Sequence, residues 1–332
     1  MVHRNMSNQT LTSEVMLVGF PGAPEYLESF ISALMFLIYI ISLVANGSVI
    51  ALVAFNGHLH QPMYLIIANL SASDILFDTV TLPKLIAKYW FGAAQMPLMV
   101  CIFQMFCVHC FGTLDSFLLL LMAVDRYVAI CHPLRYATII NVRMTVLACG
   151  ACWVVLAPFF NVIITIRISQ ITLCDRNKIS TLFCTHTAIS TLTCMEVSSL
   201  RVTAFTFALV VLLSCLALII ISYILIIKEI SSTSPENWQK AFYTCTTHLL
   251  VISLYYVPRV FVYIVTNIPL LKIQNEVNVI LLALYSFVPH LANPIIYFLR
   301  TKEITDTLQK VLRKKFRFCF SSVSFQPGTE NS

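Results

Sequence analysis

A few ionisable side chains stand inside stretches of the sequence that are otherwise strongly apolar. Three are the carboxylates of Asp74, Asp78 and Asp115, and one is the guanidinium of Arg259. An isolated charge in an apolar environment is costly, so such residues are expected to meet a partner, an ion or a ligand. Carboxylates placed in this way could share a proton or bind a cation, whereas the guanidinium could bind an anion.

The composition shows what surrounds these residues. Of 332 residues, 58% are hydrophobic and only 11% are charged, and the mean hydropathy is +0.84. Soluble domains carry about 25% charged residues and could not cover their surface with so few. A soluble enzyme, a disordered chain and a basic nucleic-acid-binding protein are therefore excluded, although the formal net charge is +6. What remains is a protein that crosses a membrane several times.

Seven stretches are apolar and long enough to cross a bilayer, which requires about 20 residues of helix. Polar connectors separate them, so neither six nor eight spans fit the pattern. The sequence predicts an all-α membrane protein, a seven-transmembrane helix bundle with a short amphipathic C-terminal helix. The predicted spans are 30–55, 63–85, 98–124, 145–166, 202–227, 241–266 and 277–299.

Basic residues near the ends of the spans predict the orientation. Seven Lys and Arg residues lie between positions 300 and 317, directly after the last span. Because positive charge is retained in the cytoplasm, the C-terminus is predicted inside and the N-terminus outside. The chain then divides into an extracellular, glycosylated tail (1–29), a helix bundle (30–300), an amphipathic juxtamembrane helix (301–318) and a disordered cytoplasmic tail (319–332). The glycosylation sites predicted in the first of these are Asn5 and Asn8.

The juxtamembrane segment has an apolar stripe at helical spacing, with basic residues over much of the remaining surface. Such a helix lies on the inner leaflet and binds anionic lipid headgroups, which makes membrane lipid a predicted partner. A disordered basic tail is the alternative. The stripe consists of Ile304, Leu308, Val311, Leu312 and Phe316.

Four of the twelve cysteines fall in segments predicted to face the oxidising side of the membrane. They are Cys101, Cys174, Cys184 and Cys194. Disulfides are favoured there over a metal site. Four cysteines allow three pairings, and spacing does not choose among them.

The sequence MAVDRYVAICHPLRY at residues 122–136 closely resembles the signature of the olfactory receptors, a branch of the rhodopsin-like G-protein-coupled receptors. Further matches occur in register along essentially the whole chain. The pair His109 and His186, together with the sequences THLL at 247–250 and RTKE at 300–303, looks more like the class I (fish-like) branch. The matching motifs are Asn46-Gly47, LHQPMY at 59–64, Leu70-Ser71 with Asp74, Trp153, Ser222-Tyr223, KAFYTCTTHL at 240–249 and PHLANPIIY at 289–297.

The resemblance implies a multi-pass plasma-membrane receptor for sensory transduction, and not an enzyme. Such receptors bind a small odorant in the outer half of the bundle and activate a stimulatory heterotrimeric G protein of the olfactory type, which raises cyclic AMP. In receptors of this kind the arginine next to Asp125 contacts the G protein once the inner helix ends separate. The residues implied in coupling and activation are Asp125, Arg126, Tyr127, Tyr223, His248, Asn293, Pro294 and Tyr297.

The resemblance also pairs the outer cysteines as Cys101–Cys184 and Cys174–Cys194, which folds the loop 167–200 over the ligand pocket. It further implies a sodium ion that stabilises the resting receptor, and no other cofactor. A pair of carboxylates that share a proton and only pack the helices is the alternative. The residues implied in the sodium site are Asp74, Asp115, Asn46 and Asn293.

Two residues fall at the same depth in the predicted bundle. His109 is eight residues below Cys101 and Arg259 is eight residues from Asn267, about 12 Å at the helical rise. Arg259 needs an anionic partner, and Asp115 lies about 9 Å deeper. A carboxylate odorant is the predicted partner, and extension of the side chain to the outer interface is the alternative. The predicted ligand-binding residues are His109, Arg259, His186, Tyr256, Tyr263, Val108, Gly112 and Phe205.

Two other functions compete with this interpretation. A non-olfactory receptor of the same class could bind a small metabolite in the same pocket. A ligand-gated channel or transporter would need polar residues through the full thickness of the membrane or repeated halves, neither of which the sequence contains. Nucleic acid is not a predicted partner.

Overall fold

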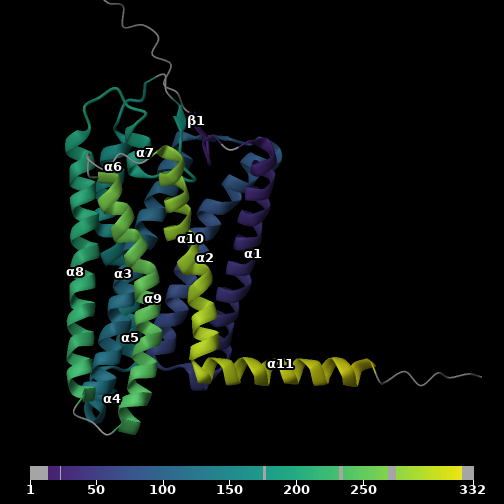
Figure 1. The fold of residues 1–332 in the computed structure, drawn as a ribbon, viewed down its shortest axis with the longest axis vertical. Helices are drawn as coiled ribbons and strands as arrows, with labels where there is room; N and C mark the ends of the chain where they lie inside the picture. The colour runs from purple at the N-terminus through teal and green to yellow at the C-terminus, as the bar shows by residue number, and fades with distance from the viewer. Residues whose placement is uncertain (1–13, 23, 175–176, 232–234, 268–273, 324–332) are drawn as a thin grey trace, which may run out of the picture.

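The computed structural model describes residues 14–22, 24–174, 177–231, 235–267 and 274–323. Within these ranges, seven helices are long and apolar enough to cross a membrane, which confirms the predicted bundle. The predicted glycosylation sites Asn5 and Asn8 lie outside the described residues, as does the tail beyond 323. Figure 1 shows the long helices side by side.

The spanning helices are longer than the apolar stretches that predicted them. Hydropathy marks only the part of a helix that lies inside the bilayer. The helical hydrogen bonds of the backbone continue beyond it, until a residue that disfavours helix ends them. Gly92, with a φ of 66°, ends one such helix in the left-handed conformation. The spans are α1 (Glu25–Phe55), α2 (Pro62–Phe91), α3 (Leu98–Cys131), α5–η3–α6 (Val142–Ala151, Cys152–Leu156, Ala157–Ser169), α8 (Ser198–Ser231), α9 (Pro235–Asn267) and α10 (Asn275–Arg300).

The fourth span is interrupted by a π-helical turn, η3, at Cys152–Leu156. Pro158 lies two residues after this turn and has no N–H to donate to the carbonyl four residues earlier. A wider turn is a usual response to a missing helical bond. Shorter elements complete the connections: η1 (Gly57–Leu59), η2 (Pro133–Arg135), α4 (Tyr136–Ile139) and α7 (His186–Ser190).

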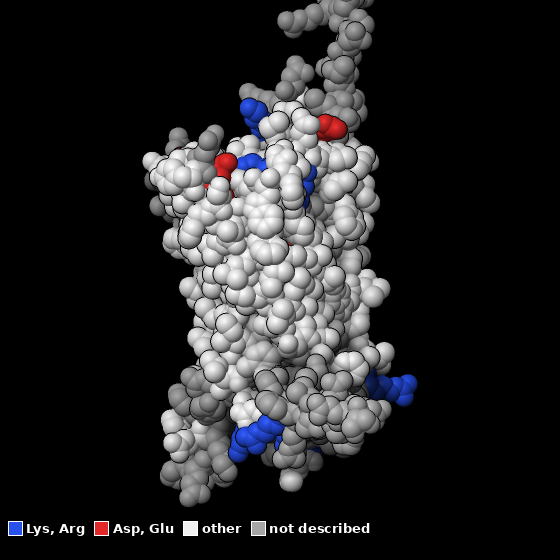
Figure 2. Space-filling view, turned by 90° about the vertical axis from the view of Figure 1, so that its right-hand side faces the viewer, with Lys and Arg blue, Asp and Glu red and all other residues white. Residues whose placement is uncertain are grey.

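The outer surface of the bundle is apolar where it would meet lipid. On the face in Figure 2, Lys, Arg, Asp and Glu gather at the two ends and leave the middle without charge. Large apolar side chains stay exposed along the helices, as a bilayer allows and water does not. On α8 they include Val210, Leu213, Leu218, Ile220, Ile221 and Ile224.

A three-stranded sheet covers one end of the bundle and was not predicted. Its central strand β1 (Glu14–Leu17) pairs antiparallel with β2 (Gln95–Pro97) and parallel with β3 (Lys178–Ile179). Val15 and Leu17 point inward and are almost fully buried, as the alternation of a strand requires. The segment 1–29 is therefore not a tail throughout, because β1 packs on the bundle and α1 starts at Glu25.

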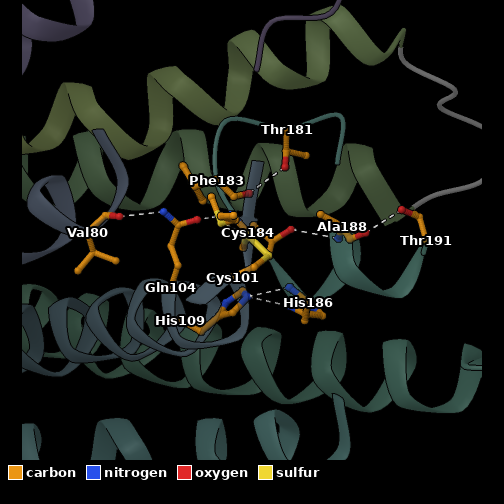
Figure 3. Close-up of a disulfide and its surroundings, with 12 residues drawn as sticks. Val80, Cys101, Gln104, His109, Thr181, Phe183, Cys184, His186, Ala188 and Thr191 are labelled. Carbon is orange, nitrogen blue, oxygen red and sulfur yellow. Dashed lines mark hydrogen bonds between the residues drawn. A yellow bond between two sulfur atoms is a disulfide. The ribbon is translucent and has the colours of Figure 1, made fainter. Parts of the chain in front are cut away.

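The loop between α6 and α8, residues 170–197 and called the lid below, covers the same end. Disulfides Cys101–Cys184 and Cys174–Cys194 confirm the predicted pairing. Gln104 reinforces the first of them, because its carbonyl accepts a bond from the Cys184 N–H and its amide donates to the Val80 carbonyl, both at 2.8 Å (Figure 3). Helices α2 and α3 and the lid are thus joined at one point.

At the opposite end, α11 (Lys302–Val323) runs across the base of the bundle (Figure 1). Ile304 is buried against the bundle, and His58 lies 2.8 Å from the hydroxyl of Thr307. The helix continues to Val323, past the predicted end at 318. No proline or glycine occurs before Pro327, so no breaker stops the helix earlier.

Candidate functional site

A cavity lies beneath the lid, between α3, α6, α8, α9 and α10. The space open to the centre of a water molecule is about 70 Å³, so the cavity suits a small ligand. Six predicted ligand-binding residues line it, namely Val108, His109, Gly112, His186, Arg259 and Tyr263. Residues that the sequence did not single out complete the wall: Phe77, Thr113, Ser116, Asn161, Ile164, Phe183, Thr185, Ala204, Phe207, Ala208, Val211, Leu212, Tyr285 and Ser286.

The side chain of Arg259 points into the bundle. The residue is 8% exposed, its Nη1 donates to the Gly112 carbonyl at 3.1 Å, and the same nitrogen donates to the Tyr255 hydroxyl. The guanidinium carbon lies 4.1 Å from the centre of the Tyr255 ring. The alternative in which Arg259 extends to the outer interface is therefore wrong, because these contacts hold it between α9 and α3.

No carboxylate among the described residues lies within 4.0 Å of this guanidinium. The Asp115 carboxylate instead accepts a hydrogen bond from Ser73 at 2.7 Å. The Nε of Arg259 has no hydrogen-bond partner in the described part of the chain. Among the described residues the buried cation thus faces a carbonyl, a hydroxyl and an aromatic ring, and its charge can attract an anion in the cavity.

Gly112 makes the inward position of Arg259 sterically possible. A Cβ at this residue would lie 3.1 Å from the Arg259 Nη1, closer than ordinary side-chain contacts allow. The absence of a side chain on α3 therefore lets the guanidinium reach the backbone. The sequence identified Gly112 as a ligand-binding residue, and the structure gives it this additional role.

Two predicted ligand-binding residues do not line the cavity. Phe205 stacks behind Tyr263, with ring centres 6.1 Å apart, and Tyr256 is buried against Tyr255. Tyr255, which was not predicted, holds Arg259. It precedes Arg259 by four residues, so the spacing that brings side chains together on a helix could have identified it.

A pair of histidines closes the cavity on the lid side. The Nδ1 of His186 lies 2.9 Å from the Nε2 of His109, and the two rings are 4.6 Å apart (Figure 3). His109 Nε2 also accepts from the backbone N–H of His186 at 3.4 Å, so it serves as an acceptor. Thr185 caps α7 by accepting from the Ala188 N–H, which fixes His186 at the start of that helix.

The buried position of His186 makes the stability of the fold depend on pH. Burial lowers the pKa of His186 from its ordinary value of 6.5 to about 4. Because the unfolded chain binds this proton more readily, the stabilisation is complete above about pH 6.5 and is lost as the pH falls towards 4. From about pH 7 to about pH 5 we expect a loss of about 2 kcal/mol, measured as a falling Tm. The His186→Gln variant should lose less stability over the same pH range. An equal loss of stability in the variant would show that His186 is not the group responsible.

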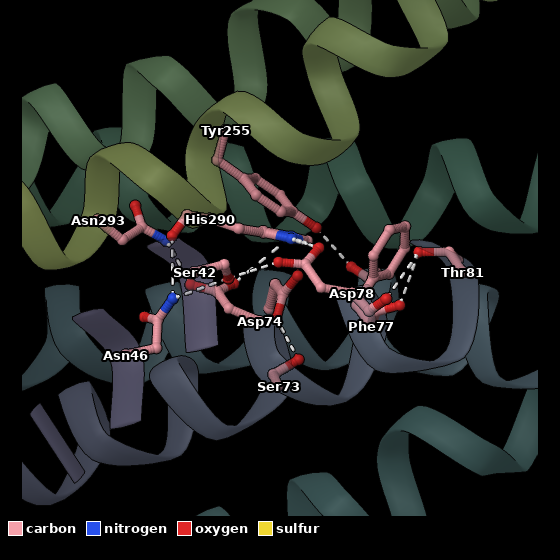
Figure 4. Close-up of polar contacts among 12 residues, drawn as sticks. Ser42, Asn46, Ser73, Asp74, Phe77, Asp78, Thr81, Tyr255, His290 and Asn293 are labelled. Atoms are coloured by element: carbon pink, nitrogen blue, oxygen red, sulfur yellow. Dashed lines mark hydrogen bonds and ion pairs between the residues drawn. The ribbon is translucent and has the colours of Figure 1, made fainter. Parts of the chain in front are cut away.

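A second polar cluster lies deeper, between α2, α3 and α10 (Figure 4). Among the described residues, Asp74, Asp115 and His290 each offer an atom able to bind a metal, and these atoms lie within 4.8 Å of one another. His290 was not predicted. Its Nδ1 lies 2.8 Å from Asp78 and its Nε2 3.5 Å from Asp74. His290 precedes Asn293 by three residues and shares its helix face, which was the available signal.

Protein donors engage most of the carboxylate oxygens at the predicted sodium site. Five of the six carboxylate oxygens of Asp74, Asp78 and Asp115 already face N–H or O–H groups of the protein. The predicted ligands Asn46 and Asn293 both donate from their amide nitrogens, and the amide oxygen of each is buried without a hydrogen-bond partner among the described residues. Asn46 donates to the His290 carbonyl at 3.0 Å and to Ser42, and Asn293 donates to Asp74 at 3.1 Å.

The residues implied in coupling lie at the α11 end of the bundle. Arg126 forms an ion pair with Asp125 at 2.7 Å, and the hydroxyl of Tyr136 donates to the other oxygen of that carboxylate at the same distance. Burial, followed by this hydrogen bond, raises the pKa of Tyr136, so the hydroxyl remains a donor. Tyr136 in α4 was the last residue of the quoted motif but was not predicted to act.

Other predicted coupling residues surround this ion pair from neighbouring helices. Tyr223 and Tyr297 are buried, and neither hydroxyl has a hydrogen-bond partner in the described part of the chain. His248 lies 2.9 Å from the sulfur of Met122, and Tyr127 lies 3.5 Å from His132. Pro294 lies inside α10, beside Asn293. The cavity and the Arg126 pair thus occupy opposite ends of the bundle, with the carboxylate cluster between them.

Comparison with known proteins identifies the family. The profile of the olfactory receptor family matches residues 35–315. The chain is 35% identical to mouse "Olfactory receptor 1E16" and 32% identical to human "Olfactory receptor 1M1", in both cases over 93% of this chain and 97% of the relative. It is 33% identical to human "Olfactory receptor 51E1", over 92% of this chain and 94% of the relative. The chain therefore belongs to the olfactory receptor family and is an odorant receptor of the G-protein-coupled class.

Proposed function

We propose that the cavity binds a small anionic odorant, such as a short carboxylate, and that this binding activates a stimulatory G protein. The observation that carries the proposal is the Arg259 guanidinium, which is buried in the cavity wall and has no carboxylate within 4.0 Å among the described residues. A carboxylate can form two parallel hydrogen bonds with such a group, and the enclosed site strengthens them.

The rest of the wall suits a short ligand with one charged end. Phe77, Val108 and Phe207 offer apolar surface, whereas Thr113 and His109 offer hydrogen bonds. The narrow space favours chains of a few carbon atoms over large odorants. We expect the carboxylate to lie against Arg259 and the apolar part to extend among the aromatic residues.

Activation follows from a competition for the same guanidinium. In the resting arrangement Arg259 joins α9 to α3 through Tyr255 and the Gly112 carbonyl. A bound anion accepts hydrogen bonds from the same guanidinium and so competes with the Gly112 carbonyl. This competition changes the relative free energy of the different arrangements of α9 and α3. A ligand shifts the equilibrium only by its preference for one arrangement, here the one that is open at the α11 end. Arg126 then leaves Asp125 to contact the G protein, and Tyr223 and Tyr297 have free hydroxyls to meet it.

The proposed orientation places the lid outside the cell and α11 in the cytoplasm. Both disulfides lie at the lid end, which suits an oxidising compartment. The basic run from 300 to 317 follows α10 at the other end, as the positive-inside rule requires. The Arg126 pair then faces the side on which G proteins are found.

The proposal is tested by measuring cyclic AMP in cells that express the full chain at the surface. The panel consists of short carboxylates, amino acids, and the alcohol and methyl ester of each carboxylate. We expect the carboxylates to be the most potent, and we expect deletion of the stimulatory G-protein α subunit to remove the signal. Equal potency of acids and their neutral analogues would contradict the anionic site, and a current that persists without G protein would favour a channel.

Gly112→Ala tests the close approach of Arg259 to α3. The added methyl group would lie 3.1 Å from Nη1 and displace the guanidinium. We expect the potency of carboxylates to fall about tenfold. This corresponds to about 1–2 kcal/mol, which is a usual cost of overpacking. Gly150→Ala is the matched control, because it adds the same methyl group to a helix with nothing within 4 Å. Equal effects of the two variants would show that helix propensity, and not this contact, is responsible.

A further inference from the structure

The polar cluster between α2, α3 and α10 contains a cation of its own. Both ring nitrogens of His290 face carboxylate oxygens, Nδ1 at 2.8 Å from Asp78 and Nε2 at 3.5 Å from Asp74 (Figure 4). A neutral imidazole has an N–H on one nitrogen and a lone pair on the other, and that lone pair would repel the second carboxylate. Only the imidazolium can donate to both, so this geometry describes His290 as a buried positive charge.

Three of the four other carboxylate oxygens accept hydrogen bonds from other side chains. Ser42 donates to the second oxygen of Asp78 at 2.5 Å, and Asn293 donates to the second oxygen of Asp74 at 3.1 Å. Ser73 donates to Asp115. A sodium ion is bound through oxygen lone pairs, and five of the six carboxylate oxygens here already face a donor of the protein.

His290 is also fixed in this position by its surroundings. Its main-chain carbonyl accepts from the Asn46 amide on α1 at 3.0 Å, and the ring packs edge-on against Phe77, with centres 5.0 Å apart. The side chain is almost fully buried. A sodium ion at the carboxylates would have to displace this packed ring, which is hydrogen-bonded to Asp78 and lies 3.5 Å from Asp74.

We infer that His290 is a built-in counter-ion, which supplies between α2 and α10 the positive charge that a sodium ion would otherwise bring to Asp74 and Asp115. The resting conformation of this receptor then does not depend on sodium. The pair Asp78–His290 is responsible for this independence of sodium. Asp78 holds the positively charged His290 ring beside Asp74.

The experiment measures the Tm of the purified full-length receptor while NaCl replaces choline chloride at constant ionic strength. An ion that binds only the folded state raises its Tm in a saturable way. We expect the unmodified receptor to keep the same Tm throughout the titration. A saturable rise with sodium in this protein would overturn the inference, and this measurement needs neither a ligand nor a variant.

The double variant Asp78→Asn/His290→Asn removes the ion pair and leaves Asp74 and Asp115. We expect sodium to raise its Tm by about 3 °C or more, because the two carboxylates then lack a cation. His290→Asn alone should gain the same dependence. His186→Asn is the matched control, since it removes a histidine from the lid, and it should remain insensitive to sodium.

A double variant that folds but ignores sodium would also overturn the inference, since some other group would then exclude the ion. If the double variant does not fold, the titration of the unmodified receptor decides the question. The readout is the stability of the receptor, so the result is independent of whether the odorant is anionic.

Discussion

The response of the receptor to short carboxylates is expected to weaken about 100-fold or more when Arg259 is replaced by methionine. Methionine keeps a long apolar side chain but removes the charge and every N–H that faces the cavity. Truncating one partner of a buried, hydrogen-bonded charge pair costs about 2–5 kcal/mol, and each 1.4 kcal/mol is about tenfold in affinity. The concentration–response curve for cyclic AMP, corrected for surface expression, measures the loss.

Two further variants show whether the charge or its geometry matters. Arg259→Lys keeps the charge but loses the planar fork, so an intermediate potency is expected. Arg201→Met is the matched control, because Arg201 is exposed at the start of α8, and it should leave the curve unchanged. A normal carboxylate response in Arg259→Met would show that the ligand does not use this guanidinium. Responses to the corresponding alcohols should survive in all three variants.

Loss of the Cys101–Cys184 disulfide is expected to remove most of the receptor from the cell surface. Both sulfur-bearing residues are fully buried, and the bond closes a loop across 83 positions of the chain. In the chain-entropy account a loop of this length is worth about 4.5 kcal/mol, a large share of the 5–15 kcal/mol that stabilises a typical protein. Cys184→Ser should therefore lower surface staining severalfold and reduce the Tm of the protein that remains.

The second disulfide provides the comparison. Cys174–Cys194 closes a loop across only 20 positions, and Cys194 is exposed. The same account gives about 3.3 kcal/mol, so Cys194→Ser should be less damaging than Cys184→Ser. Cys131→Ser changes a free, partly exposed cysteine and should have little effect. Equal surface expression of Cys184→Ser and Cys131→Ser would show that the lid folds without its central bond.

The spans and their depth could be predicted because the bilayer imposes them. A helix in lipid must be apolar over a known length, and its rise converts sequence distance into depth. His109 and Arg259 were predicted at one level on this basis, and both line one cavity. Helical rotation was harder to predict. Adjacent residues point about 100° apart, so Tyr256 was predicted to line the ligand site, whereas its neighbour Tyr255 is the residue that contacts Arg259.

Contacts between helices could not be read from one sequence. His290 meets Asp78 only because α10 packs on α2, and the two residues are far apart in the chain. Asp74 and Asp115 were predicted to lie close together at a sodium site, but His290, which contacts Asp74 from α10, was not predicted. The strand at Glu14–Leu17 was missed for a similar reason. Four residues carry little periodicity, and both partners of this strand lie in distant loops.

The position of that strand sets a constraint on the order in which the receptor is made. Met16 is synthesised near the beginning of the chain, yet it pairs with Lys178, which leaves the ribosome only after four spans are complete. Until then the central strand has an unpaired edge, which is open to chaperones or to other chains. A segment that emerges early is thus among the last to reach its final place. The odorant site can therefore be completed only after β1 has paired with β3, however fast the helices insert into the membrane.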